Sequence, residues 1–575
     1  MKLTISKSKN SESFYISKSY IDNSGKSTTA TVRKLGTLSE LLKDHGPTRD
    51  DVIAWCRSEV AAETQKYKQA RKTKSVQIVF NADKEIDYSQ RRLFDGGYLF
   101  PQAIYYKLQM DKVCKAIKQR HQYEYDLNAI LSDLIYNRIL DPHSKRSAYK
   151  AAQSYLESPS YELHDIYRAL SVLAKESDFI QAEAFKNSNF FGKRNDRILY
   201  YDCSNFYFEI EQEDGNKKYG KSKEHRPNPI VQMGLFIDGD GIPLAYSIFP
   251  GNQNEQKSLK PLESKILQQF GHDKFIYCSD AGLGSTDNRK FNHLGERAFI
   301  VTQSIKKLDA TNKELALNRE GFKRLSDSQK VSAKEMDNAD DDELYYKEIP
   351  YISGNIDQLL IVTYSPKYAA YQKAIRESQI QRAEAMIKNG QLKKNRKNPN
   401  DPARFIGKDA CTKDGEVADI HYYLDESKVA DESRYDGLYA VCTDLIDDDV
   451  KEILKVSEGR WQIEECFRIM KTDFSARPVY IRRDDRINAH FLICFLSLLI
   501  YRLLEKQLKN KYTCEEILDK LKSMKFADIK GQGYMPTYIR NKLTDDLHSI
   551  CGFKTDYEFI TKADMRTIEK KSKQR

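Results

Sequence analysis

Two stretches of this sequence end in the same way: residues 197–202 read Arg-Ile-Leu-Tyr-Tyr-Asp, and residues 275–280 read Phe-Ile-Tyr-Cys-Ser-Asp. Each is a short apolar run, as expected for a buried strand, and each closes on an aspartate, Asp202 or Asp280. In open α/β sheets, ligands bind at the carboxyl ends of the strands. Two carboxylates at that edge can share divalent metal ions, which prefer oxygen ligands. Either aspartate alone is also compatible with a cap on the following turn or helix.

The sequence around these two stretches alternates between strand and helix patterns. Apolar runs at 230–237, 244–249 and 297–302 predict further strands, and a turn at 238–241 joins the first two. Residues 255–270 have helical character. Strands followed by helices predict the α/β class, with a mixed sheet that carries helices on its faces.

A third carboxylate, Glu464, lies in a stretch that predicts one long helix, residues 449–474. At about 100° per residue, three cations share the face of Glu464, whereas Glu465 is rotated away from it. Ion pairs within the helix would explain this face. A metal-binding carboxylate flanked by cations that hold DNA phosphates would explain it equally well. The cations are Arg460, Arg468 and Lys471.

At these residues the sequence resembles the DDE transposases of bacterial insertion sequences, in particular the group with a Tyr-x2-Arg-x3-Glu-x6-Lys signature. Arg460, Glu464 and Lys471 match that spacing, and Ser457 stands where the group has tyrosine. The surroundings of Asp202 and Asp280 are also similar to the family pattern. The resemblance covers roughly residues 100 to 510. Three further similar segments are Gly251-Asn252-x-x-Glu255, Arg477-Pro-Val-Tyr480 and Asp485-Arg-Ile-x-Ala-His490.

The resemblance implies an RNase H-like catalytic core, which is a mixed sheet flanked by helices, interrupted by a β-rich insertion. The long gap between Asp280 and Glu464 agrees with such an insertion, since the α/β pattern stops near residue 303. Asp202, Asp280 and Glu464 would then be the catalytic carboxylates and would bind two Mg²⁺ ions, with Mn²⁺ as a substitute. The implied reaction is hydrolytic nicking at the element ends, followed by attack of the freed 3′-hydroxyl on target DNA. A hairpin route and another route to second-strand cleavage both stay open.

Six segments are expected from these patterns. An N-terminal β-hairpin spans residues 13–35, and a helical pattern follows it. Both parts are candidates for DNA binding. The segments are 1–100 (β-rich), 101–195 (helical), 196–302 (first part of the core, with Asp202 and Asp280), 303–438 (insertion), 439–525 (second part of the core, with the Glu464 helix) and 526–575 (a C-terminal helical region with a basic, frayed tail).

Further basic residues are candidates for DNA contacts. One group lies between the first and second predicted strands, and a denser group lies in the basic stretch 388–408. Either group is also compatible with a solvated surface. With the three cations of the Glu464 helix, the predicted DNA-binding residues are Arg460, Lys471, Arg468, Lys223, Arg226, Lys393, Lys394, Arg396 and Lys397. Tyr345, Tyr346 and Tyr351 in the insertion are either stacking partners for a flipped base or ordinary strand residues.

Composition restricts the class of protein. The chain has 575 residues, 40% of them hydrophobic and 31% charged, and a net charge of +10, which favours a polyanionic partner. The ten cysteines form no Cys-x-x-Cys pair and read as buried apolar residues of a reducing compartment. The apolar run 491–501 is too short for a membrane span. Residues 215–222 have the Gly-x-x-x-x-Gly-Lys-Ser spacing, but they lie between two predicted strands, whereas a phosphate-binding loop joins a strand to a helix. We therefore expect a cytoplasmic protein without a membrane segment or nucleotide cofactor, and the resemblance implies that it is bacterial and DNA-associated.

Three functions remain in view. The leading hypothesis is a cut-and-paste transposase whose partners are double-stranded DNA, both terminal inverted repeats and target, and a second copy in a dimeric synaptic complex. A structure-selective, metal-dependent nuclease would share the core without strand transfer. A catalytically silent DNA-binding protein derived from a transposase would bind DNA without cutting it.

Overall fold

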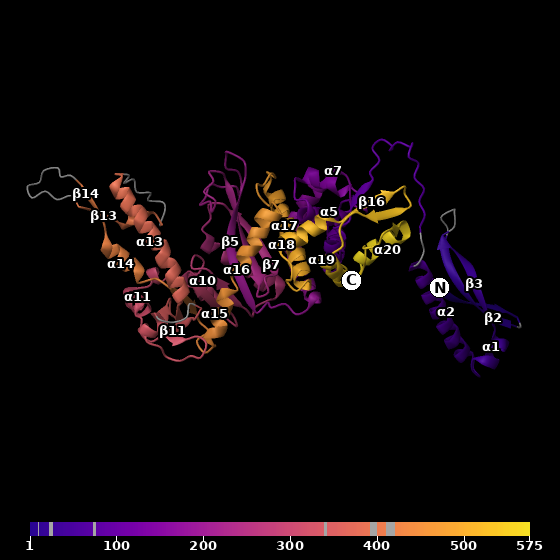
Figure 1. The fold of residues 1–575 in the computed structure, drawn as a ribbon, viewed down its shortest axis with the longest axis horizontal. Helices are drawn as coiled ribbons and strands as arrows, with labels where there is room; N and C mark the ends of the chain where they lie inside the picture. Colours follow the sequence, from indigo (N-terminus) through magenta and orange to yellow (C-terminus); the bar gives the residue numbers. More distant parts are fainter. Residues whose placement is uncertain (10, 22–26, 73–75, 338–341, 391–399, 410–419) are drawn as a thin grey trace, which may run out of the picture. The chain divides into compact units, whose positions relative to one another are not determined.

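The computed structural model describes residues 1–9, 11–21, 27–72, 76–337, 342–390, 400–409 and 420–575 (Figure 1). The chain divides into two compact units, Met1–Gln90 and Arg91–Arg575, and each is described by itself.

The first unit is a small sheet covered by helices. Strand β2 pairs antiparallel with both β1 and β3, so the predicted hairpin is confirmed and β1 is an additional strand. Alternation along β2 buries Phe14 and Ile16, and Phe14 packs with Leu41, Val52 and Cys56. The elements are β1 (Lys2–Ser8), β2 (Ser11–Ile21), β3 (Ser27–Thr37), α1 (Leu38–Asp44) and α2 (Arg49–Lys72).

The second unit is built on one large mixed sheet, which fits the expected RNase H-like core. Its strand order in the described residues is β10-β11-β12-β15-β9-β8-β5-β6-β7. Strand β5 is antiparallel to β6 and parallel to β8, which is parallel to β9. The strands are β5 (Ile198–Tyr207), β6 (Ile230–Asp238), β7 (Pro243–Pro250), β8 (Ile276–Ser279), β9 (Ala298–Thr302), β10 (Lys323–Arg324), β11 (Tyr345–Ser353), β12 (Ile356–Tyr364) and β15 (Leu438–Thr443).

The stretch expected as an insertion is continuous with this sheet. Strand β12 pairs antiparallel with β15, so β10, β11 and β12 extend the core sheet. Tyr345 and Tyr346 are buried in β11, as ordinary strand residues are. The remaining elements of the stretch are α11 (Ala310–Leu317), α12 (Ala333–Asp337), α13 (Pro366–Lys388), β13 (Ile406–Asp409), β14 (His421–Leu424), α14 (Glu426–Ser433) and two 3₁₀ turns (Ile305–Lys307 and Pro402–Phe405).

Helices surround the other strands, and of those that the structure describes, α17 (Asp484–Gln507) has the largest number of buried residues. It lies against α5, α7 and β7 and is the one described helix long and apolar enough to cross a membrane, with 94% of its apolar window buried inside the protein (Figure 1). The predicted helices near 127–135 and 166–180 are confirmed. The helices before the sheet are α3 (Leu99–Lys107), α4 (Met110–Arg120), α5 (Leu127–Leu140), α6 (Lys145–Ala152), α7 (Leu163–Lys175), α8 (Ser177–Ser188) and a 3₁₀ turn (Asn189–Phe191).

The single long helix expected around Glu464 is wrong in detail. The structure has α15 (Val450–Glu458), α16 (Trp461–Arg468) and a π-helical turn (Ile469–Asp473). Between α15 and α16 the backbone bonds span three residues, from Gln462 N–H to Gly459 O (3.2 Å) and from Ile463 N–H to Arg460 O (3.1 Å). Residues 255–270 are likewise helical in pieces. These pieces are a 3₁₀ turn (Glu255–Lys257), α9 (Leu259–Lys265), a π-helical turn (Ile266–Phe270) and, after β8, α10 (Thr286–Asn292).

The C-terminal region closes back on the start of the second unit. Strand β16 pairs with β4, and the sheet order is β18-β17-β16-β4. The frayed tail expected at 570–575 is wrong, because Ser572 is buried and Lys573 pairs with Glu157 (2.5 Å). The elements are β4 (Leu93–Asp95), α18 (Cys514–Ser523), β16 (Lys525–Ile529), β17 (Gly533–Pro536), α19 (Lys542–Cys551), β18 (Ile560–Thr561) and α20 (Lys562–Ser572).

Candidate active site

Asp202 lies on β5, and Asp280 directly follows β8, the parallel neighbour of β5 in the large sheet. Strands β5 and β8 pair with Ile198 opposite Ile276 and Tyr200 opposite Cys278. The same register continued by two residues sets Asp202 opposite Asp280, the first residue after β8. The prediction that the first strand ends at Asp202 is wrong, because β5 continues to Tyr207. Asp202 lies within β5, beside the point where the parallel strand β8 ends, so the two carboxylates lie next to each other at that edge of β8.

Asp202 is held in place by its own strand. The Cys203 backbone N–H donates to Asp202 Oδ1 (2.7 Å), and the side chain keeps 22% of its surface exposed. The pKa of Asp202 is raised to about 6, chiefly by burial; the charges of Asp280 and Glu255 contribute to the rise, whereas Lys223 and the Cys203 amide oppose it. Three carboxylates therefore interact electrostatically at this edge.

Asp280 opens a tight loop. The Leu283 backbone N–H donates to Asp280 Oδ1 (3.0 Å). Asn288 on α10 holds the other side of the loop, because its Nδ2 donates to Leu283 O (2.8 Å). The Asp280 side chain remains exposed, so one of its oxygens is available at the surface.

Glu464 lies on α16, whose approach to the sheet is fixed by three contacts. Tyr200 Oη donates to Val456 O (2.8 Å), and Arg460 Nη1 donates to Thr302 Oγ1 at the end of β9 (2.8 Å). A Cβ on Gly459 would lie 2.2 Å from Tyr200 Oη, so only glycine lets the chain pass this closely. Figure 1 shows α16 beside β5.

The Glu464 side chain is exposed and makes no hydrogen bond or ion pair with any residue that the structure describes. Among the described residues, no three His, Cys, Asp or Glu side chains are gathered closely enough to hold a metal ion. The assignment of Glu464 as the third ligand stays a prediction.

The cations predicted on the Glu464 face have different neighbours. Arg468 pairs with Glu465 (2.7 Å) and Asp473 (3.1 Å). Lys471 lies over the Phe206 ring of β5, with its Nζ 5.5 Å from the ring centre and 3.8 Å from Glu224 Oε1. Burial and the charge of Lys223 lower the pKa of Lys471 to about 8, and Asp202 opposes the decrease. Of the helix cations, Lys471 is thus the one coupled to the aspartate edge.

The segment between β5 and β6, residues 208–229, which we call the arm, brings further charges to Asp202. Lys223 Nζ lies 3.9 Å from Asp202 Oδ1 and 3.9 Å from Glu255 Oε1. Arg226 is exposed, lies over the Tyr207 ring and pairs with Glu224 (3.7 Å).

Four of the predicted DNA-binding residues lie outside the described residues. They are Lys393, Lys394, Arg396 and Lys397.

Glu224, Glu255 and Arg477 were not predicted as site residues. Glu224 is ion-paired with Lys471 and Arg477, and Glu255 faces Lys223. The Gly251-Asn252-x-x-Glu255 and Arg477-Pro-Val-Tyr480 segments contained the signal for two of them. Glu224 carried no such signal, because its partners come from a distant part of the chain.

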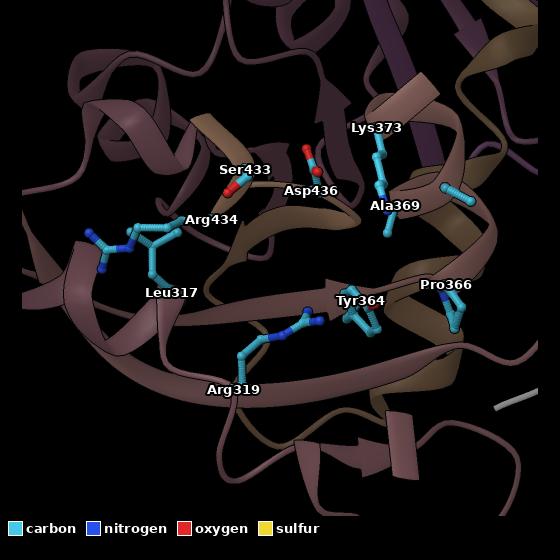
Figure 2. A pocket seen from close by; sticks show the side chains of 10 residues that line it. Leu317, Arg319, Tyr364, Pro366, Ala369, Lys373, Ser433, Arg434 and Asp436 are labelled. Atoms are coloured by element: carbon cyan, nitrogen blue, oxygen red, sulfur yellow. The ribbon is translucent and has the colours of Figure 1, made fainter. Parts of the chain in front are cut away.

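A cavity of about 660 Å³ lies in a different region, between the end of β12 and the first turns of α13 (Figure 2). The Arg319 guanidinium stacks on the Tyr364 ring there, 3.8 Å from its centre. Asp436 pairs with Arg376 (2.5 Å) and Arg434 with Glu314 (2.7 Å), so much of the charge in the lining is already neutralised.

Comparisons with known proteins give one family and several solved structures, two of which are transposase complexes with DNA. The family model described as "Transposase DDE domain" matches residues 193–500, more than half of the chain, and this range contains Asp202, Asp280 and Glu464. The cryo-EM structure of a piggyBac transposase synaptic complex with hairpin DNA is similar at 9% identity, covering 76% of this chain and 82% of that chain, with a TM-score of 0.36. The Mos1 transposase paired-end complex with the left transposon end is similar at 11% identity, covering 44% and 68%, with a TM-score of 0.13. A search of curated proteins gives no match.

Proposed function

This chain belongs to the family of transposases that share a DDE domain, and from that premise we propose that it is the transposase of an insertion sequence. It binds the terminal inverted repeats, cuts the DNA strands at the element ends and joins the freed 3′-hydroxyl to target DNA. Its partners are double-stranded DNA and a second copy of the chain in a synaptic complex, and it works in the bacterial cytoplasm.

One observation carries the proposal: Asp202 and Asp280 share an edge of the sheet, and the charge of Asp280 raises the pKa of Asp202. Two carboxylates that repel each other in this way are stabilised by a shared divalent cation. A structural cap needs no second carboxylate beside it. The pair therefore supports a metal-binding role over a cap.

The side chains present fit a divalent metal ion. Asp202 and Asp280 supply hard oxygen ligands, as Mg²⁺ or Mn²⁺ requires, and the exposed Glu464 supplies a third carboxylate. Two such ions, when bound, stabilise the entering and leaving oxygens of an in-line phosphoryl displacement. The specific ion and the number of ions are part of the proposal.

The cations of the site position DNA. Lys471 is only 14% exposed and is coupled electrostatically to Asp202, so it is suited to neutralise a phosphate close to the scissile bond. Arg460 holds α16 on β9 through Thr302 and adds charge there. Arg226 and Lys223 on the arm, Arg468, and the basic residues at 393–397 would contact the DNA backbone more loosely.

Strand cleavage and joining by purified full-length protein test the proposal. The substrate is DNA carrying the element's own ends, with Mg²⁺ or Mn²⁺. We expect Asp202→Asn, Asp280→Asn and Glu464→Gln each to reduce cleavage and joining by at least about 10³-fold while end binding is retained, because each removes a metal-binding charge.

Asp273→Asn is the matched control, since Asp273 is exposed and lies before β8, at the opposite end of that strand. It should cut and join like the unmodified protein. Cleavage without any joining would favour the structure-selective nuclease. Specific end binding without cleavage would favour the silent DNA-binding protein. Full activity of Glu464→Gln would remove Glu464 from the site, and Glu465 would be tested next.

A further inference from the structure

The arm is fastened to β5 directly beside Asp202. Asn205 is buried on β5 and binds the arm twice: its Oδ1 accepts from the Lys223 backbone N–H (3.0 Å), and its Nδ2 donates to Lys221 O (3.2 Å). The backbone of Lys223 is therefore fixed relative to the strand that carries Asp202.

The Lys223 side chain extends from the arm toward the carboxylates of Asp202 and Glu255. Its Nζ donates to Cys203 O, the carbonyl of the residue after Asp202. The same ammonium lies 3.9 Å from both Asp202 and Glu255, so it stands between two carboxylates that belong to different elements. With 42% of its surface exposed, the side chain also has an open path to solvent.

This position has an electrostatic consequence. Asp280 and Glu255 disfavour the ionised form of Asp202, and Lys223 is the largest opposing charge. A divalent metal ion at Asp202 and Asp280 would supply the same compensation. It would also be repelled by an ammonium so close to Asp202.

We propose that Lys223 is the resident counter-cation of the carboxylate site: it compensates Asp202 and Glu255 in the metal-free protein and is displaced when a divalent metal ion binds. The inference rests on the proposed function, because it requires Asp202 and Asp280 to bind metal. The displacement needs only side-chain rotation, since lysine has a flexible four-carbon stem and Asn205 holds the backbone. The released ammonium is then available to a DNA phosphate.

Mn²⁺ titration of the full-length protein without DNA tests the inference by calorimetry. Lys223→Met should bind Mn²⁺ about three- to tenfold more tightly than the unmodified protein, because a competing charge worth roughly 1 kcal/mol is gone. Lys221→Met is the matched control: Lys221 is exposed on the same arm, and the contact with Asn205 uses its backbone. Its affinity should not change.

A second measurement follows the ammonium itself. Acetylation by an amine-selective reagent is quantified by mass spectrometry with and without Mn²⁺. Labelling of Lys223 should increase several-fold on addition of Mn²⁺ in the unmodified protein but not in Asp202→Asn, and labelling of Lys221 should stay constant in both.

The outcomes separate the inference from the proposed function. Mn²⁺ binding that Asp202→Asn abolishes, with unchanged or weaker binding by Lys223→Met, overturns the inference and leaves the metal site intact. Labelling of Lys223 that does not respond to Mn²⁺ also overturns it. Absence of Mn²⁺ binding by the unmodified protein overturns both.

Discussion

Asp202 is a carboxyl group in a setting that disfavours its charge. It lies within β5, and its pKa is raised to about 6, chiefly by burial and also by the charge of its neighbour Asp280. The unfolded chain has neither constraint, so its aspartate titrates near the ordinary value of about 3.9. Ionisation of Asp202 therefore costs stability in the metal-free protein.

The sign of the pH dependence follows directly. Because the pKa of Asp202 is higher in the folded than in the unfolded protein, its protonated form favours folding. This contribution to the free energy of unfolding is fully present below pH 4 and is lost as the pH rises through about 6. Asp202→Asn removes the cost, and its oxygen can still accept from Cys203. In the presence of a chelator, we expect the variant to melt about 1–3 °C higher than the unmodified protein at pH 7.5 and about half as much higher at pH 5, by scanning calorimetry.

Asp273→Asn serves as the control and should leave the melting temperature unchanged at both pH values, since Asp273 is exposed. A lower melting temperature for Asp202→Asn at pH 7.5 would show that the aspartate has a stabilising structural role. Added Mn²⁺ should narrow the difference between the variant and the unmodified protein, because the metal compensates the charge in the latter alone.

At the scale of elements, the join between α15 and α16 sets where Glu464 lies. Gly459 passes so close to Tyr200 that a Cβ would be 2.2 Å from the hydroxyl oxygen and 3.0 Å from Cζ. The Tyr200 hydroxyl in turn donates to Val456 O on α15. Strand β5 thus fixes both Asp202 and the helix that carries Glu464.

Gly459→Ala should therefore shift α16 and reduce strand cleavage about tenfold or more, because sub-ångström positioning of the carboxylates matters for the reaction. Gly459 has an ordinary helical backbone conformation, so alanine is opposed by the contact and not by φ. Cleavage at element ends is the measurement.

Tyr200→Phe combined with Gly459→Ala gives the decisive comparison. Loss of the hydroxyl removes the closest contact, so the double variant should recover part of the activity that Gly459→Ala loses. If Gly459→Ala and the double variant had equal activity, the Tyr200 hydroxyl would not be the cause of the loss.

The sequence predicts the strands of this site better than the connection between α15 and α16 or the pairing of distant strands. The apolar runs before Asp202 and Asp280 identify β5 and β8, because a buried strand is recognised from its local run of apolar residues. The break at Gly459 was missed, since its cause is Tyr200, more than two hundred positions away in the chain. In the same way, local sequence does not reveal that β12 pairs with β15, which makes the expected insertion part of the core sheet. The approach of Lys223 to Glu255 depends on the same kind of long-range contact.

At the scale of the whole molecule, the chain consists of two compact units that meet in sequence at residues 90 and 91. Residues 76–92 around this boundary contain no helix or strand, and Lys84 and Arg91 are exposed there. Exposed segments without regular structure are preferred sites of proteolysis.

Brief trypsin treatment should therefore cut after Lys84 or Arg91 and leave a resistant product that ends at Arg575. We expect this product to melt within about 2 °C of the corresponding transition in the full chain, since the second unit has its own core. Mass spectrometry identifies the cut, and calorimetry follows the product. Lys84→Gln with Arg91→Gln should slow its appearance, whereas rapid degradation of the product would contradict independent folding.

The pairing of β4 with β16 has a consequence for synthesis. A ribosome exposes β4, which ends at Asp95, long before it makes β16, which begins at Lys525. Gly97, which packs against the Leu521 backbone, is likewise synthesised long before its partner. A nascent chain therefore carries Asp202, Asp280 and Glu464 before the second unit can close, and a prematurely terminated chain never closes it. We therefore expect a chain that stops before Lys525 to be degraded in the cell, so a frameshift upstream of this codon abolishes function even when the codons for all three carboxylates are intact.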